Sequence, residues 1–263
     1  MCPAMISIMA IKAVLTKNHL QRMAAVVFAL LVWQAAAMLV NESLLLASPI
    51  QVAGRLFSLV GTADFWATVM HTGCRIVLGF LAGFAAGIGL AIAAGRFKWV
   101  EMLLWPFVVT IKTIPVASFV ILVLIWLGSR QLSVFISFLM VFPVIYLNTL
   151  QGIQSTDTKL LEMAAIFRLT GSQKLRHIYL PHLRPFLTGG CSIALGLSWK
   201  SGVAAELIGR PDASMGDMLY MAKIHFDTSE LFAWTFVIIL LSLLFEKLFL
   251  YGLKACFEKA VKG

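Results

Sequence analysis

The sequence predicts an all-α membrane protein with six transmembrane helices, and three observations support this fold class. Of the 263 residues, 60% are hydrophobic and 13% are charged, against about 45–50% and about 25% in a soluble domain. The apolar residues gather in runs near the ~20 residues that a bilayer requires. Lys and Arg fall mainly in alternate loops. The composition excludes a cytosolic enzyme, a disordered chain and a disulfide-rich secreted module.

Six segments are apolar enough to be predicted as spans. Lys112 and Pro115 interrupt the third, so its membrane part is expected at residues 114–127 with a turn or two before it. Pro143 lies within the fourth and is tolerated because neighbouring groups can satisfy the freed carbonyl. The predicted spans are residues 23–40, 76–94, 102–127, 132–150, 185–208 and 231–250.

The loop charges predict the orientation. Thirteen Lys and Arg residues lie on the side of both termini and five on the other side. The positive-inside rule therefore places residues 1–22 and the C-terminal tail in the cytoplasm. Residues 23–263, with the six spans and the loops between and after them, are predicted to form the transmembrane domain. The four cysteines are scattered and predict neither a metal site nor a disulfide.

The outer segments carry helix-capping signals. Ser48 followed by Pro49 predicts a short amphipathic helix on the outer face. The pairs Ser214 with Asp217 and Asp227 with Glu230 have capping-box spacing, and the second pair is predicted to begin the sixth span.

The second span carries three glycines at intervals of four residues. Such a stripe lets another backbone approach closely, and this packing replaces the hydrophobic drive that is missing in lipid. The sequence leaves open whether the stripe faces another span or a second copy of the chain. The three residues are Gly79, Gly83 and Gly87.

The cytoplasmic loop at about residues 154–184 is more than a connector. Asp157 is expected to cap a helix with one apolar face. Gly171 is expected to end that helix in a left-handed conformation, with Ser172 capping a second short helix that stops at Pro181. Two short helices of this kind fit a groove in another protein.

Residues 162–181 of this loop, EMAAIFRLTGSQKLRHIYLP, resemble the EAA loop of ABC importer permeases. Met163 replaces the first alanine of that pattern and Arg168 replaces its glycine, so the turn is expected to be shifted toward Gly171 or reshaped. The resemblance implies that the loop docks into a cleft of a separate ATPase subunit. The coupling residues it implies are Glu162, Ala164, Ala165, Arg168, Gly171, Ile178, Leu180 and Pro181.

Residues 48–60, 71–95 and 198–209 are similar to the nitrate, sulfonate and taurine branch of these permeases. This resemblance implies a homodimer in the bacterial inner membrane. It also implies an extracytoplasmic substrate-binding protein and transport of a small solute such as a sulfonate, taurine or nitrate. The chain contains no Gly-Lys pair and hence no P-loop, so ATP is expected to bind to the partner subunit, with no cofactor, metal or enzymatic activity in this chain.

The fifth predicted span carries a small, polar stripe with one lysine. A charge at membrane depth normally faces a cavity or a partner. Lys200 is interpreted as an attractor for an anion in the pathway, or alternatively as a snorkelling or paired lysine, and Glu206 as an outer-gate or structural acid. The candidate pathway residues are Ser192, Gly196, Lys200 and Ala204.

Two other function classes remain open on the residues alone. A membrane-embedded enzyme would need clustered acids, histidines or a metal at membrane depth, and the acids here gather mainly in the outer loop. A secondary transporter often shows two similar halves with broken helices, and no such repeat is present. Neither class explains the two-helix cytoplasmic loop.

Overall fold

The computed structural model describes residues 3–42 and 44–262, with side chains for 21, 23–42 and 44–260. Within these residues all regular secondary structure is helical, as the sequence predicts, and there is no strand. It divides into two compact units. Met1–Gly61 and Ala222–Ala233 form one unit, and Thr62–Met221 and Trp234–Gly263 form the other.

The smaller unit contains α1 (Pro3–Val40), α2 (Pro49–Val60) and the first residues of α11 (Thr228–Lys262). Ser48 caps α2 in a capping box with Gln51, and Pro49 occupies the first turn, so the predicted short helix is confirmed. Its apolar side packs in a small core built on Ala47, Val52 and Ala233.

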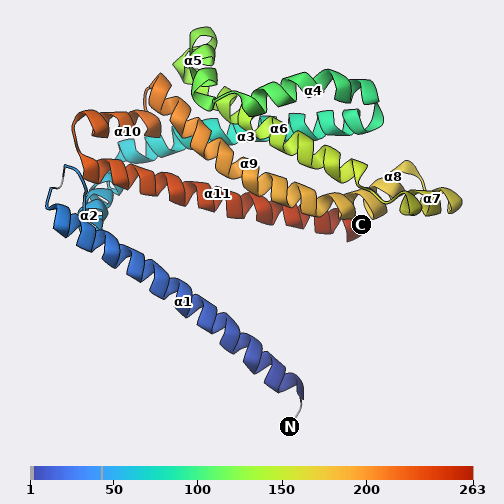
Figure 1. The fold of residues 1–263 in the computed structure, drawn as a ribbon, viewed down its shortest axis with the longest axis horizontal. Coiled ribbons are helices and arrows are strands. Elements are labelled where there is room, and N and C mark those ends of the chain that lie inside the picture. Colours follow the sequence, from blue (N-terminus) through green and yellow to red (C-terminus); the bar gives the residue numbers. More distant parts are fainter. Residues whose placement is uncertain (1–2, 43, 263) are drawn as a thin grey trace. The chain divides into compact units, whose positions relative to one another are not determined.

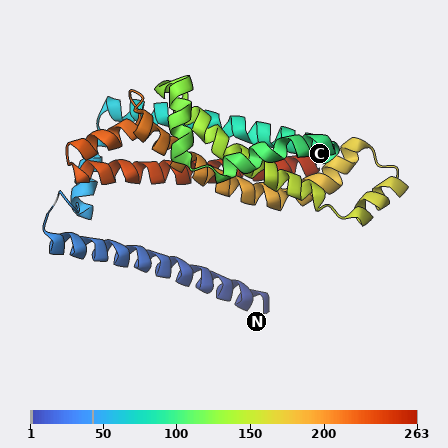
Figure 2. The same ribbon diagram turned by 45° about the horizontal axis from the view of Figure 1, so that its top comes forward.

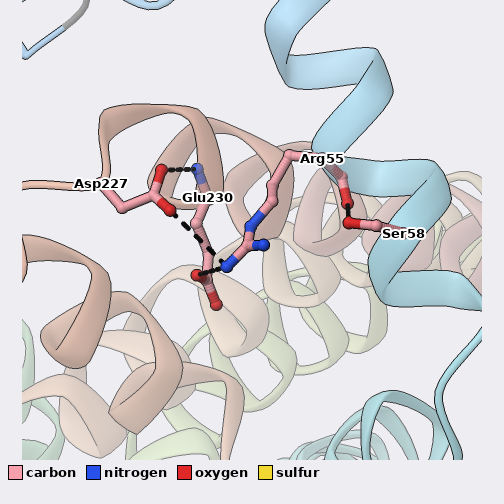
Figure 3. Close-up of polar contacts among 4 residues, drawn as sticks. All are labelled: Arg55, Ser58, Asp227 and Glu230. Atoms are coloured by element: carbon pink, nitrogen blue, oxygen red, sulfur yellow. Dashed lines mark hydrogen bonds and ion pairs between the residues drawn. The ribbon is translucent and has the colours of Figure 1, made fainter.

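A surface ion pair ties α2 to the start of α11 within this unit (Figure 3). Nη2 of Arg55 lies 2.6 Å from Oε2 of Glu230 and 3.6 Å from Oδ2 of Asp227. Asp227 also accepts a hydrogen bond from the Glu230 backbone N–H and so caps α11, as its spacing with Glu230 predicts. The hydrogen bond to Glu230 raises the pKa of Arg55 above its usual value. The stability gained from this shift would be lost only as the pH rises through that elevated pKa, far above the physiological range.

The larger unit is built around three long helices, α3 (Ala63–Arg96), α6 (Ser129–Gln154) and α9 (Leu180–Gly209). α6 packs against both α3 and α9, as Figures 1 and 2 show. Two short helices, α7 (Thr158–Ile166) and α8 (Gly171–Lys174), project from one end of this bundle, and the first residues of α10 (Met215–Ile224) lie at the other end. The remaining elements of this unit are α4 (Lys98–Thr113), α5 (Val116–Leu127), the π-helical turn η1 (Leu175–Tyr179), α10 up to Met221, and α11 from Trp234 onward.

The glycine stripe of α3 lies against α6 of the same chain. A Cβ atom on Gly79 would overlap the carbonyl oxygen of Val134. A Cβ atom on Gly83 or Gly87 would lie 2.9 Å from the Cβ atom of Val141 or Ile145. The absence of side chains at these three positions is therefore what allows the two backbones to approach.

Four described helices are long and apolar enough to cross a membrane: Met23–Val40 of α1, α3, α6 and Thr228–Ala260 of α11. Four of the predicted spans fall within them. The third predicted span is instead two helices, α4 and α5, with an angle of 108° between them. The break lies at Pro115, whose ring cannot continue the preceding helix. The fifth corresponds to α9, which is long enough but less apolar than the other four.

Candidate functional site

The predicted cytoplasmic loop forms α7 and α8, and its first cap is the predicted one. The Asp157 side chain accepts a hydrogen bond from the Lys159 N–H at 2.9 Å and so begins α7. α8 begins differently from the prediction. Thr170, rather than Ser172, is its N-cap, in a capping box with Gln173.

The turn after α7 forms at the motif position that Arg168 occupies, not at Gly171. Arg168 has φ = +51°. Its N–H donates to the carbonyl of Ala165, and the N–H of Leu169 donates to the carbonyl of Ala164. This pair of bonds is a Schellman motif, which normally places glycine at the left-handed residue. The prediction of a left-handed Gly171 is therefore wrong: the turn keeps its place and Arg168 takes the strained conformation.

The second short helix does not stop at Pro181, which corrects another prediction. η1 follows α8 directly and leads into α9, with Pro181 in the first turn of α9. The N–H of Leu180 donates to the carbonyl of Leu175, five residues back. The wider π turn accommodates the proline, which has no N–H of its own to place.

Polar contacts fix both ends of the loop to the bundle. Oγ of Ser155 lies 3.1 Å from Nε2 of His182. Nε of Arg176 donates to the carbonyl oxygen of Ala260 near the end of α11, at 2.6 Å. A displacement of the loop would therefore be transmitted to α9 and α11.

The free end of the loop exposes large apolar side chains. Ile166 is 79% exposed and Phe167 is 71% exposed, with Leu160 and Met163 each 42% exposed beside them. Of the eight predicted coupling residues, Glu162, Ala165, Arg168, Gly171 and Pro181 are exposed, Leu180 is half-buried, and Ala164 and Ile178 are buried. The buried ones support the loop, whereas the exposed ones are available to a partner.

The stripe on α9 lies on a partly open face of the larger unit. Lys200 is exposed, and Ser192, Gly196 and Ala204 are half-buried. Apart from the chain neighbours and backbone of its own helix, no described atom lies within 4 Å of a Cβ atom placed on Gly196. Among the described residues Lys200 forms no ion pair, so the structure does not support its pairing with Glu206. The hydroxyl of Ser192 donates to Oε1 of Glu246 on α11.

Glu206, in contrast, is fully buried at the other end of α9. Its Oε2 accepts a hydrogen bond from Oγ1 of Thr72 at 2.8 Å and lies 3.5 Å from the Gly216 N–H at the start of α10. The Met215 N–H donates to the same Thr72 hydroxyl at 2.9 Å, and Nη1 of Arg75 lies 3.7 Å from Oε1 of Glu206. The carboxylate therefore holds the N-terminus of α10 against α3, where the helix dipole favours a negative charge.

The family of the chain follows from a comparison with known proteins. Residues 79–263 match the family described as binding-protein-dependent transport system inner membrane component. The chain belongs to this family. It is a permease subunit of an ABC importer in the inner membrane.

Several named permeases are similar to this permease over most of its length. The taurine transport system permease protein TauC of Escherichia coli K12 is 27% identical over 81% of this chain and 80% of its own. The riboflavin transport system permease protein RibX of Chloroflexus aurantiacus is 29% identical over 77% and 76%. A Bacillus subtilis protein named for aliphatic sulfonates transport, SsuC, is 29% identical over 77% and 74%.

The structure of the permease adds residues that the sequence analysis did not assign to a site. Thr72 and Arg75 contact Glu206, and Glu246 contacts Ser192, in each case from another helix. No spacing in the sequence connects these positions. The only available signal was that Arg75, Glu206 and Glu246 are charged residues within or beside apolar segments.

Arg168→Gly is expected to stabilise the coupling loop of the permease by about 0.5–1 kcal/mol. Glycine relieves the left-handed strain of about 1–2 kcal/mol, and its greater freedom in the unfolded chain offsets part of that gain. Amide hydrogen exchange at Leu169, which donates within the turn, should slow by a few-fold. Gly171→Ala is the control, because Gly171 has an ordinary φ and no other residue near its Cβ position. Faster exchange in Arg168→Gly would contradict the Schellman geometry.

Thr72→Val is expected to lower the stability of the permease by about 1–3 kcal/mol. The variant keeps the shape of the side chain but leaves Glu206 and the Met215 N–H without their shared hydroxyl, and unpaired buried polar groups carry a cost of this size. Thermal unfolding in detergent measures it. Thr188→Val is the control, since among the described residues the Thr188 hydroxyl bonds only the Arg184 carbonyl of its own helix. Equal melting temperatures of the two variants would show that the Thr72 bonds contribute nothing.

Proposed function

We propose that two copies of this permease form the translocation pathway for a small anion and couple it to two separate ATPase subunits through the loop at about residues 154–184. We further propose six spans with both termini cytoplasmic, α9 and the bent pair of α4 and α5 supplying the two less regular ones. The excess of Lys and Arg on the side of the termini supports this orientation.

The exposed apolar tip of the coupling loop is the observation that carries the ATPase assignment. Exposure of the apolar side chains of Ile166 and Phe167 to water is unfavourable in free energy. They lie at the end of the short helix α7, and a short helix with an exposed apolar side can bind in a groove of another protein. The loop is anchored to α9 and α11, so docking at the tip can reach the helices that carry the proposed pathway. Nucleotide is bound by the partner alone, and the permease needs no cofactor.

The α9 stripe supports the proposed pathway and substrate class. Lys200 is exposed, carries a positive charge and has no ion-pair partner among the described residues, so an anion is the ligand it would attract. The relatives named for taurine and aliphatic sulfonates favour a sulfonate, and nitrate is the smaller alternative. An extracytoplasmic binding protein would deliver the solute, as the family description implies.

Lys200→Met is expected to reduce uptake of a labelled alkanesulfonate by about tenfold or more, because the variant removes the one charge on the stripe that attracts an anion. Uptake is measured in cells that contain the whole importer, with equal permease in the membrane checked by immunoblot. Lys247→Met, an exposed lysine on α11 outside the stripe, is the matched control. Wild-type uptake by the Lys200→Met variant would contradict the proposed role of Lys200 in the pathway.

A further inference from the structure

A cavity of about 590 Å³ opens in the larger unit, at the end of the bundle that carries the coupling loop. Its size is within the range of ligand pockets, about 300–1,000 Å³. Residues of α3, α6, η1, α9 and α11 line it, and nearly all are apolar. Among them are Ile88, Ile92, Ile153, Leu183, Leu187 and Phe257.

One buried hydroxyl in this lining has no partner within the described part of the chain. Thr149 is 1% exposed, and its Oγ1 forms no hydrogen bond to any described residue. Threonine in a helix commonly bonds the carbonyl four residues back, as Thr188 of α9 does with the carbonyl of Arg184. A buried hydroxyl without a bond is uncommon, so the Thr149 hydroxyl can donate to a polar atom of a ligand inside this mainly apolar cavity.

A cation and a pair of aromatic residues mark the level of the cavity in the membrane. Arg96, the last residue of α3, is exposed, lines the cavity and has no ion-pair partner among the described residues. Phe97 and Trp99 beside it are 50% and 65% exposed. Aromatic side chains together with Arg and Lys are typical of the membrane–water interface, so the Arg96 end of the cavity lies at headgroup level and its apolar body at the level of acyl chains.

We propose that this cavity binds an acyl chain of an anionic phospholipid, whose headgroup pairs with Arg96 and one of whose oxygens accepts the Thr149 hydrogen bond. The apolar lining excludes a polar solute as the occupant, and the charge of Arg96 favours an anionic lipid over a zwitterionic one. The assignment of this lipid to the cytoplasmic leaflet rests on the proposed orientation.

The bound lipid touches the segment that joins the coupling loop to α9. Leu175 and Tyr179 of the π turn and Leu180 after it line the cavity. π turns inside helices often lie at functional sites and leave local freedom in the backbone. A lipid at this position therefore supports the hinge between the ATPase contact and the pathway helix.

The direct test is photo-crosslinking of the full chain, with its co-purifying subunits, in nanodiscs. The probe is a phosphatidylglycerol with a diazirine on its acyl chain, and mass spectrometry maps the labelled peptides. Label is expected on the cavity-lining peptides of α6, α9 and α11. Arg96→Gln should reduce it about fivefold, whereas Lys98→Gln, which removes a neighbouring exposed cation outside the lining, should not. The proposal would be overturned if these two variants were labelled equally. It would also be overturned if a phosphatidylcholine probe labelled the wild type as strongly as the phosphatidylglycerol probe does.

A second pair of variants tests the cavity itself. Cys256 lines it and Cys74 does not, and both are exposed free cysteines. Cys256→Trp should occupy part of the cavity and strongly reduce labelling of the lining peptides, while Cys74→Trp leaves labelling unchanged. Size-exclusion profiles establish that both variants fold. Unchanged labelling in Cys256→Trp, or crosslinks from the lining to a second copy of the chain in place of lipid, would contradict a lipid site. Neither readout depends on transport, so the result stands apart from the proposed substrate and pathway.

Discussion

Gly79→Val is expected to destabilise the permease by at least about 3 kcal/mol and to leave little folded protein in the membrane. A Cβ atom at this position overlaps the backbone oxygen of Val134 and lies 2.8 Å from the Cβ atom of Ser137. Neither atom can turn aside as the end of a flexible side chain could, so α3 and α6 must separate. Overpacking in a core costs typically about 1–3 kcal/mol and occasionally more, and a native protein has only about 5–15 kcal/mol in total.

Gly89→Val is the matched control for this prediction. Gly89 lies on the same helix, and nothing is within 4 Å of its Cβ position. The variant should fold with nearly wild-type stability in the membrane. Fluorescence-detected size exclusion after a series of heating steps measures both variants. If Gly79→Val and Gly89→Val melted together, the close approach of α3 to α6 would not be what stabilises this unit.

Phe167→Asp is expected to reduce ATP-driven uptake by about thirtyfold or more without affecting folding of the permease. Its side chain is 71% exposed, so the folded subunit loses little. In the assembled importer the same side chain would be buried against the ATPase, where an anchor residue contributes about 2 kcal/mol or more, and each 1.4 kcal/mol is a factor of ten. Ile166→Asp, at 79% exposure, should behave in the same way.

Ser172→Asp controls for the charge itself. Ser172 is an exposed residue at the start of α8, where a negative charge is favourable for the helix. Uptake, co-purification of the ATPase and size-exclusion profile are measured for all three variants. The proposed docking tip would be contradicted if Phe167→Asp kept its ATPase and its uptake, or if Ser172→Asp lost them to the same degree.

Local signals predicted most of the helices and several of their caps. Asp157, Ser48 and Asp227 cap the helices expected of them, because an N-cap depends only on the next three residues. The turn at Arg168 was not predictable in the same way. The sequence offered a glycine at 171, but the Schellman bonds of α7 place the left-handed residue at 168 whatever its identity.

Long-range contacts were beyond the sequence. Glu206 could be recognised as a costly charge in a span, but its partners Thr72 and Gly216 lie 134 and 10 residues away and meet it only through packing of α3, α9 and α10. The glycine stripe of α3 predicted a close contact, yet its partner α6 is identified only by the fold. The bend between α4 and α5 was predictable only in part. Pro115 indicates a break in the helix, but the angle of 108° depends on packing that the sequence does not show.

Site-specific crosslinking from Phe167 in native membranes tests the central claim most directly. A photoreactive amino acid at Phe167 should capture a P-loop ATPase, identified by mass spectrometry. The same probe at Phe226, which is also 71% exposed but belongs to the proposed outer segment, should not capture it. Capture from Phe167 alone is the result that the coupling-loop account predicts. Absence of an ATPase at Phe167, or its capture from Phe226 instead, would contradict the account.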